Sequence, residues 1–295
     1  MSRPVETLHR NRGAGGRVTN SDLVEEQAQE PRGRENANST GARIVHNMPA
    51  SAPKRLLTIV GPTASGKTAV GVECARLLEA EVVSADSMQV YRGLDIGTAK
   101  PAPEEQSGIP HHLMDIVDPD EEFSVAQYKE MAERAIEDIF SRGRQPIVVG
   151  GSGMYVRAVI GRWSMTGAPK DANLRAELER QASEKGLDAL YRRLQEIDPE
   201  AAAKISPADE KRIIRALEVF ETTGMPISRF HEQDEKSEPK YESVTVGLSL
   251  ERAELYRRIE ERVDKMMEAG FLEEVEFLRK QGFGPDLISM KALGY

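Results

Sequence analysis

The chain has 295 residues, enough for one large domain or two of moderate size. Its single cysteine, Cys74, excludes an internal disulfide framework and a cysteine-rich zinc site. No apolar run reaches the roughly 18 residues that a membrane-spanning helix needs, and a net charge of −9 argues against indiscriminate polyanion binding, although a local basic face can still bind RNA.

Residues 1–53 form a polar segment without aromatic residues or sustained periodicity. Such a segment buries too little apolar area to offset the entropy lost on ordering, so we expect a disordered tail. Its arginines would also suit a transit peptide, but acidic residues such as Glu25, Glu26 and Glu30 are unusual in such peptides. Met48 lies shortly before the first predicted strand and is an alternative start of the protein.

An α/β core is predicted from residue 54 onwards. Strands and helices are expected to alternate in this order: Leu56–Val60 (strand), 66–78 (helix), Glu81–Ala85 (strand), Ser124–Ser141 (helix) and Pro146–Val149 (strand). This alternation indicates a parallel sheet covered by helices on both faces. Val70, Cys74, Leu77 and Leu78 are expected along one apolar face of the first helix.

The pattern changes at residues 168–240, where no strand-like run occurs. The segment is charged and helical, with predicted helices at Leu174–Lys185, Leu187–Ile197 and Ala208–Thr222. We interpret it as an all-helical domain inserted into the core. Strand character returns at Val244–Leu250 and a long helix begins near Glu251, so the core is expected to comprise residues 54–167 and 241–295.

A phosphate-binding pattern, G-x-x-x-x-G-K-[ST], follows the first predicted strand and opens the first predicted helix. Its residues are Gly61, Pro62, Thr63, Ala64, Ser65, Gly66, Lys67 and Thr68. Backbone N–H groups and the helix N-terminus would face an anion, Lys67 would add a full positive charge, and Thr68 would offer its hydroxyl to Mg²⁺. The loop predicts a diphosphate or triphosphate ligand without specifying which.

Proteins with such a loop most often bind ATP or GTP, which makes a small-molecule kinase one interpretation. In hydrolysing nucleotide enzymes a second apolar strand usually ends in an acidic metal ligand, whereas the run ending at Val149 is followed by Gly-Gly-Ser. Asp86 follows another predicted strand, at the carboxyl edge of the sheet where open α/β folds bind ligands. Asp86 is therefore predicted to share a crevice with the phosphate loop.

Five blocks of sequence resemble those of the bacterial tRNA dimethylallyltransferase family and occur in that family's order. They are Gly61–Thr68, Asp86–Pro101, Pro110–Ile116, Val149–Tyr155 and Lys211–Phe220, within a resemblance that covers roughly residues 55–295. The resemblance implies a P-loop NTPase-like fold whose helical insertion binds the tRNA anticodon stem-loop. The implied reaction, with Mg²⁺, transfers a dimethylallyl group from dimethylallyl diphosphate to N6 of the adenosine immediately 3′ of the anticodon and releases diphosphate.

The resemblance also implies roles for individual residues. The phosphate loop would hold a diphosphate rather than a nucleotide, and Asp86 would be the general base that accepts a proton from the adenine amine. Ser152 stands where the family commonly has Thr, and its hydroxyl is expected to keep the catalytic role. The implied tRNA contacts are Asp86, Ser87, Met88, Gln89, Ser152, Arg175, Lys211, Arg212, Ile213, Ile214 and Arg215.

Several alternatives remain open at this point. The nearest is transfer of the same group to free adenine nucleotides, although the helical insertion favours tRNA. A kinase would instead transfer the γ-phosphate of ATP, and a non-enzymatic nucleotide sensor would leave Asp86 unexplained. His111 and His112 are interpreted as hydrogen-bonded structure rather than catalysts. We expect a cytoplasmic monomer, and, because family members continue beyond Tyr295, weak or unstable activity of the chain as it stands.

Overall fold

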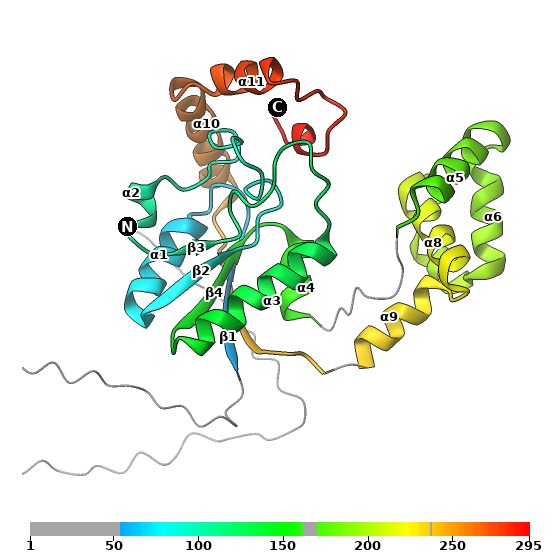
Figure 1. Cartoon of the computed structure of the whole chain (residues 1–295), viewed down its shortest axis with the longest axis horizontal. Helices are drawn as coiled ribbons and strands as arrows, with labels where there is room; N and C mark the ends of the chain where they lie inside the picture. The colour runs from blue at the N-terminus through cyan, green and yellow to red at the C-terminus, as the bar shows by residue number, and fades with distance from the viewer. Residues whose placement is uncertain (1–53, 162–169, 237) are drawn as a thin grey trace, which may run out of the picture.

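The computed structural model describes residues 54–161, 170–236 and 238–295. Its centre is a five-stranded, wholly parallel sheet in the order β3-β2-β4-β1-β5 (Figure 1). The strands are β1 (Arg55–Val60), β2 (Ala80–Ser84), β3 (His111–His112), β4 (Gln145–Gly150) and β5 (Glu242–Gly247). The predicted parallel α/β sheet is thus confirmed, and its four longer strands begin and end within three residues of their expected limits.

Helices cover this sheet on both faces. Helix α1 (Lys67–Leu78) packs on one face, and α3 (Val125–Ser141) and α4 (Gly153–Ile160) pack on the other. The other helices of the core are α2 (Pro103–Gln106), α10 (Arg252–Glu268) and α11 (Phe271–Lys280), followed by the short 3₁₀ helix η1 (Ser289–Lys291). Successive side chains of a strand point to opposite faces. Ile147 accordingly lies in the cluster that includes Ala75 of α1, whereas Val148 lies in the cluster that includes Tyr128 of α3.

The packing face of α1 differs from the expected one. Leu77 and Leu78 are 82% and 50% exposed, and the residues that α1 buries are Gly71, Val72 and Ala75. A Cβ atom at Gly71 would lie 2.8 Å from Val149 Cγ2, so the missing side chain lets the helix lie close to β4. The expectation was wrong for Leu77 and Leu78, because small residues, rather than the largest apolar ones, set this contact. The other two expected residues, Val70 and Cys74, are partly buried and pack against the cluster on this face of the sheet.

Helix α3 places an aromatic side chain beneath the edge of the sheet where ligands are expected. Its N-cap Ser124 forms a capping box with Gln127. One turn later, Tyr128 is fully buried, stacks on Tyr155 of α4 with ring centroids 3.8 Å apart, and donates a hydrogen bond to the carbonyl oxygen of Ser84. These contacts fix the end of β2, immediately before Asp86.

A second group of helices lies between β4 and β5 in the chain and apart from the sheet (Figure 1). It consists of α5 (Ala172–Lys185), α6 (Leu187–Ile197), α7 (Pro199–Lys204), α8 (Glu210–Thr223) and α9 (Ile227–Lys236). These helices have an apolar cluster of their own, centred on Leu178, Leu194 and Leu217. The expected helices are confirmed; α7 and α9 were not foreseen, and the expected boundary at residue 167 lies outside the described residues, as does the tail of residues 1–53.

Within the ranges 54–161, 170–236 and 238–295, no helix combines the length and apolar character needed to cross a membrane.

Candidate active site

The phosphate loop has the backbone conformation that its sequence requires. Ala64 has a φ of 61° and Gly66 a φ of 88°, and Gly66 is also the N-cap of α1. A left-handed residue other than glycine is uncommon, and such strained positions concentrate at functional sites. Turns of this kind align successive backbone N–H groups around an anion. The loop is therefore built as an anion-binding element at the start of a helix.

Lys67 lies over this loop. Its Nζ atom donates a hydrogen bond to the carbonyl oxygen of Pro62 at 2.7 Å, and a Cβ atom at Gly151 would be 3.6 Å from Nζ. Burial lowers the pKa of Lys67; the Asp86 carboxylate opposes that shift and the Arg262 guanidinium adds to it. Lys67, Asp86 and Arg262 thus share one electrostatic neighbourhood, although they come from three different parts of the chain.

A buried hydroxyl in the loop has no hydrogen-bond partner among the described residues. This is Ser65 Oγ, which lies so close to Gly61 that a Cβ atom there would be 2.8 Å away. A buried polar group without a partner costs about 1–3 kcal/mol. Ser65 therefore provides a hydrogen-bonding group inside the cradle that the rest of the described chain does not use.

Asp86 begins the segment after β2, and its carboxylate is fixed by the backbone that follows. Oδ1 accepts hydrogen bonds from Met88 N at 2.9 Å and from Gln89 N at 3.4 Å. Ser152 Oγ accepts one from Ser87 N at 2.8 Å and donates one to Ser87 Oγ at 3.1 Å. All five residues are partly buried. The predicted catalytic pair is thus held by two sets of hydrogen bonds, one at Asp86 and one at Ser152, which the chain joins at residues 86 and 87.

The ends of β2 and β4 converge to bring this group together. Ala85 N donates to Val149 O at 2.8 Å, and Ser152 N donates to Ala85 O at 3.1 Å. A Cβ atom at Gly150 would come within 2.1 Å of Ala85 O, which no side chain can do. Gly150 is therefore required for the close approach of the strand ends that carry Asp86 and Ser152.

Gln89 connects the site to the loop at residues 95–100. Its Nε2 atom donates to Thr98 O at 3.3 Å and to Ala99 O at 3.2 Å, and its Oε1 atom accepts from Ser84 Oγ at 3.3 Å. Gln89 and Thr68, the expected metal ligand, both line a small cavity. The other lining residues are Val82, Ser84, Pro101, His111, Met114 and Val149.

Arg262 was not foreseen as a site residue. It lies on α10, is partly buried, and donates from Nη2 to Thr98 O at 3.4 Å. Burial lowers the pKa of Arg262, and the nearby Asp86 carboxylate opposes this shift. In sequence it is one of many charged residues on a long helix, and no local pattern distinguishes it from the others.

The two adjacent histidines are hydrogen-bonded structure, as interpreted from the sequence, but they form β3 rather than part of a loop. His111 Nδ1 is 2.9 Å from Ile109 O, and His112 Nε2 is 2.7 Å from Glu81 Oε2. The strand is only two residues long, too short for any hydrophobic periodicity to indicate it.

In the insertion, Arg175 and Arg215 lie side by side on the carboxylate of a buried residue, Glu218. Glu218 Oε2 accepts from Arg175 at 2.6 Å and from Arg215 at 2.8 Å, while Oε1 accepts from Asp171 N at 3.0 Å. Burial opposes ionisation, yet the hydrogen bonds from Arg215 and Arg175 hold the pKa of Glu218 below its usual value. Both arginine side chains remain about one third exposed, at 35% and 34%. They form a paired basic element at the surface.

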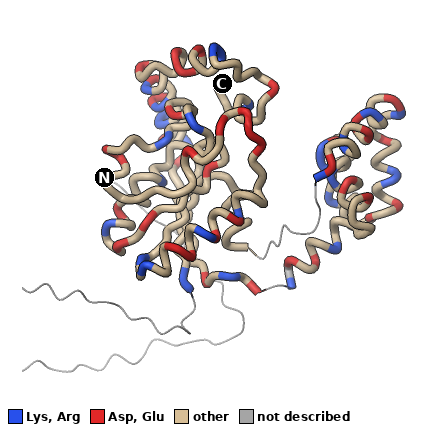
Figure 2. Tube along the Cα trace, viewed as in Figure 1, with Lys and Arg blue, Asp and Glu red and all other residues tan. Residues whose placement is uncertain are grey.

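The other expected tRNA contacts in α8 divide into two classes. Lys211 and Arg212 are exposed, with Arg212 Nε 3.2 Å from an Asp209 oxygen (Figure 2 shows basic and acidic residues interspersed along these helices). Ile213 and Ile214 are buried in the apolar cluster of the insertion. The expectation of side-chain contacts with tRNA is therefore corrected for these two, because on this amphipathic helix they form the buried side that packs on the other helices.

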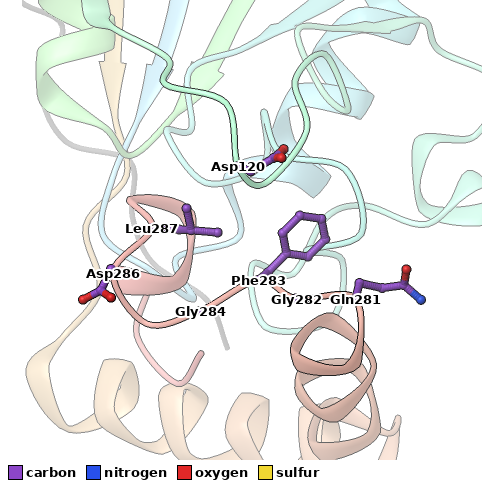
Figure 3. A pocket seen from close by; sticks show the side chains of 7 residues that line it. All are labelled: Asp120, Gln281, Gly282, Phe283, Gly284, Asp286 and Leu287. Atoms are coloured by element: carbon purple, nitrogen blue, oxygen red, sulfur yellow. The ribbon is translucent and has the colours of Figure 1, made fainter.

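A surface cavity lies elsewhere. It has a volume of about 350 Å³ and is lined by Asp120, Gln281, Gly282, Phe283, Gly284, Asp286 and Leu287 (Figure 3). None of these is an expected site residue, and its charged lining is acidic, which does not suit a phosphate. Across the described part of the chain, no group of three or more His, Cys, Asp or Glu side chains is arranged to hold a metal ion.

Fold and loop together define a P-loop α/β protein with a helical unit between its fourth and fifth strands. Comparison with known proteins identifies its family. A sequence model described as IPP transferase matches residues 89–295. The tRNA dimethylallyltransferase of Roseiflexus castenholzii is 54% identical over 240 residues, which are 81% of this chain and 78% of that protein. The chain belongs to the IPP transferase family.

Solved structures agree with this assignment. The tRNA isopentenylpyrophosphate transferase of Bacillus halodurans is 46% identical, with a TM-score of 0.57 over 82% of this chain and 75% of that one. A eukaryotic dimethylallyltransferase described as acting on tRNA is 31% identical, with a TM-score of 0.71 over 82% of this chain and 61% of its own. The family placement predicted from the sequence is confirmed.

Proposed function

We propose that this protein transfers the dimethylallyl group of dimethylallyl diphosphate to N6 of the adenosine immediately 3′ of the anticodon in tRNA, releasing diphosphate. One observation carries the proposal: Lys67 of the phosphate loop and Asp86 interact electrostatically at the carboxyl edge of the sheet. An anion cradle and a carboxylate in one neighbourhood suit a reaction that expels diphosphate from one substrate and removes a proton from the other. Family membership supplies the substrate class.

The phosphate loop would stabilise the diphosphate leaving group. As the bond between the allylic carbon and oxygen breaks, positive charge develops on carbon and negative charge on the diphosphate. Lys67 and Arg262 would stabilise the departing anion, together with the backbone N–H groups of the loop and the unpartnered hydroxyl of Ser65. Donors fixed in advance at the position of developing charge are among the strongest contributors to catalysis.

Thr68 fits a role as a ligand of Mg²⁺. Magnesium in phosphoryl sites is usually held by one or two protein oxygens, with substrate phosphates and water completing the shell. The Thr68 hydroxyl, at the first turn of α1, suits an ion held mainly by the diphosphate. When bound, Mg²⁺ would neutralise charge on the leaving group.

Asp86 would accept the proton of the adenine amine. This amine is a weak nucleophile because its lone pair is delocalised into the ring, so it needs both positioning and proton removal. The backbone hydrogen bonds from Met88 and Gln89 both use Oδ1 of Asp86, which leaves Oδ2 to face the acceptor. A placed base contributes about 10²–10⁴-fold in rate, and correct positioning about 7–11 kcal/mol. Ser152 would orient the segment that carries the base.

The insertion would bind the anticodon stem-loop. Arg175 and Arg215 present two guanidinium groups of fixed orientation, a geometry suited to phosphate oxygens, and Lys211 and Arg212 add charge on the same helix as Arg215. An unpaired loop adenosine is the cheapest base to unstack, at a few kcal/mol, so it can enter the site.

We further propose that the protein acts as a monomer in the cytoplasm, where its tRNA substrate is available; the single Cys74 suits a reducing compartment. We also propose that the catalytic core comprises residues 54–167 and 241–295, and that the tRNA-binding helical insertion comprises residues 168–240.

The test is to incubate the protein with labelled dimethylallyl diphosphate, Mg²⁺ and unmodified tRNA. Label in the tRNA, at the adenosine beside the anticodon, is the expected result. Parallel reactions replace the tRNA by AMP, ADP or ATP, or supply γ-labelled ATP without the diphosphate. Label in a free nucleotide would identify the acceptor as a small molecule, and transfer of a γ-phosphate would establish a kinase instead.

A further inference from the structure

We propose that Glu274 of α11 is a positioning residue for this reaction: its carboxylate fixes the loop at residues 95–97, and this loop holds Gln89 and Arg262 beside Asp86. The inference rests on the proposed function. Glu274 is distant in sequence from the phosphate loop, Asp86 and Ser152, and it would touch neither substrate.

The carboxylate of Glu274 occupies a concave stretch of backbone. It accepts hydrogen bonds from Asp95 N at 3.1 Å, from Ile96 N at 2.9 Å and from Gly97 N at 3.3 Å. Three consecutive N–H groups that converge on one anion form a backbone nest, and hydrogen bonds to a charged acceptor are stronger than neutral ones. The side chain therefore determines the position of this loop far more strongly than a surface glutamate would.

The fixed loop leads directly to the site. Thr98 and Ala99 follow residues 95–97, and their carbonyl oxygens accept from Gln89 Nε2, while Thr98 O also accepts from Arg262 Nη2. The backbone N–H of Gln89 in turn donates to Asp86 Oδ1. A continuous series of contacts thus runs from the Glu274 carboxylate to the proposed base and to a cation of the diphosphate site.

Aromatic packing closes the other side of the loop. The Tyr295 hydroxyl donates to Glu274, and the rings of Tyr295 and Phe271 meet edge to face with centroids 5.1 Å apart. A Cβ atom at Gly97 would lie 2.3 Å from the Phe271 ring and 2.5 Å from the Tyr295 ring. Gly97 is therefore pressed against the same two residues that flank the carboxylate.

A separate set of contacts holds the same segment from its other end. Lys100 Nζ donates to Tyr91 O at 2.9 Å and forms ion pairs with Asp95 and Asp115. Because these contacts do not involve Glu274, the segment should stay folded when Glu274 is changed, and the effect should be one of placement. This separates positioning from a general loss of structure.

The test compares E274Q with E273Q, which changes an exposed glutamate on the same helix. Steady-state prenyl transfer should show kcat of E274Q reduced by up to about 100-fold, the effect of a roughly 1 Å misplacement, with KM for tRNA within twofold of wild type. E273Q should behave as wild type. An unchanged kcat for E274Q, or a rise in KM for tRNA alone, would overturn the inference.

Hydrogen exchange gives a readout that does not depend on activity. In E274Q the amides of residues 95–97 should exchange faster, and so should those of Met88 and Gln89, which bind Asp86; E273Q should change neither. Faster exchange at 95–97 without any change at Met88 and Gln89 would refute the coupling. If wild type shows no prenyl transfer, the proposed function fails, while this exchange test still decides whether Glu274 positions residues 95–97 and, through them, the backbone that binds Asp86. If E274Q does not fold, Y295F, which removes one donor to Glu274, should show the same pattern to a smaller extent, and wild-type exchange there would refute it.

Discussion

Replacing Glu218 by glutamine should destabilise the helical insertion and weaken its binding to RNA. Glutamine preserves the shape and one carbonyl oxygen but removes the charge that two guanidinium groups share. In the wild-type protein, Glu218 Oε2 accepts from both Arg175 and Arg215, and Oε1 accepts from Asp171 N. The substitution therefore leaves both guanidinium groups without the negative charge that holds them side by side.

The expected size follows from the burial of the group. Removing one partner of a buried pair costs about 3–5 kcal/mol, and a single hydrogen bond to a charged group contributes about 1.5–3 kcal/mol. The carboxylate is fully buried, but the two arginines are 35% and 34% exposed, so water can solvate their charge once the carboxylate is gone. We therefore expect E218Q to lose about 2–3 kcal/mol in the free energy of unfolding, at or just below the lower limit for a fully buried pair.

Urea unfolding measures this loss, with E221Q as the matched control. Glu221, in the same helix as Glu218, pairs with Arg193 of α6 at 2.5 Å, but both side chains are partly exposed, so its loss should cost less than about 1 kcal/mol. Because the two arginines lose their fixed orientation, E218Q should also make the salt dependence of tRNA binding less steep. The magnitude of the slope of log K for tRNA binding against log salt should fall by about 0.7 for each phosphate that the protein no longer neutralises. A free energy of unfolding for E218Q equal to that of E221Q would refute the reasoning.

Three further outcomes are expected. Hydrogen bonds from Arg142 lower the pKa of Glu81 from 4.5 to about 2. A carboxyl group whose pKa is lowered on folding stabilises the fold above pH 4.5, and this contribution is lost as the pH falls towards 2. The free energy of unfolding in urea should therefore decrease between pH 4.5 and pH 2, and it should decrease less in E81Q. In G150A the new Cβ atom would lie 2.1 Å from the backbone oxygen of Ala85, so thermal unfolding should show a loss of stability of about 1–3 kcal/mol. G153A is the control, because a Cβ atom there has open space around it, and its stability should equal that of wild type. K67M should lose about 10²–10³-fold in turnover while a filter-binding assay shows unchanged tRNA affinity.

The elements that follow from local pattern could be predicted from the sequence. Buried parallel strands are continuous apolar runs, so β1, β2 and β4 were recognisable, and the glycines and lysine of residues 61–68 identify a phosphate loop wherever a strand and a helix flank them. Ser124, a residue type that often caps helices, stands at the start of the predicted helix and is the N-cap of α3. Each of these signals lies within a few consecutive residues.

The remaining features depend on contacts between distant residues. Arg262 and Glu274 reach residues 96–98 from helices more than 160 positions away, and neither has a local signal. Ile213 and Ile214 belong to a family motif, but only the packing of α8 reveals that their side chains are buried. A motif therefore identified where the chemistry lies without distinguishing the residues that touch a ligand from those that hold the helix in place.

The most direct test of the account is single-turnover prenyl transfer by D86N. The structure fixes Asp86 through its own backbone turn, and asparagine can keep those hydrogen bonds, so folding and tRNA affinity should be unchanged. The rate of transfer to tRNA should fall by about 10²–10⁴-fold, because asparagine cannot accept the proton. A rate equal to that of wild type would contradict the assignment of Asp86 as the base.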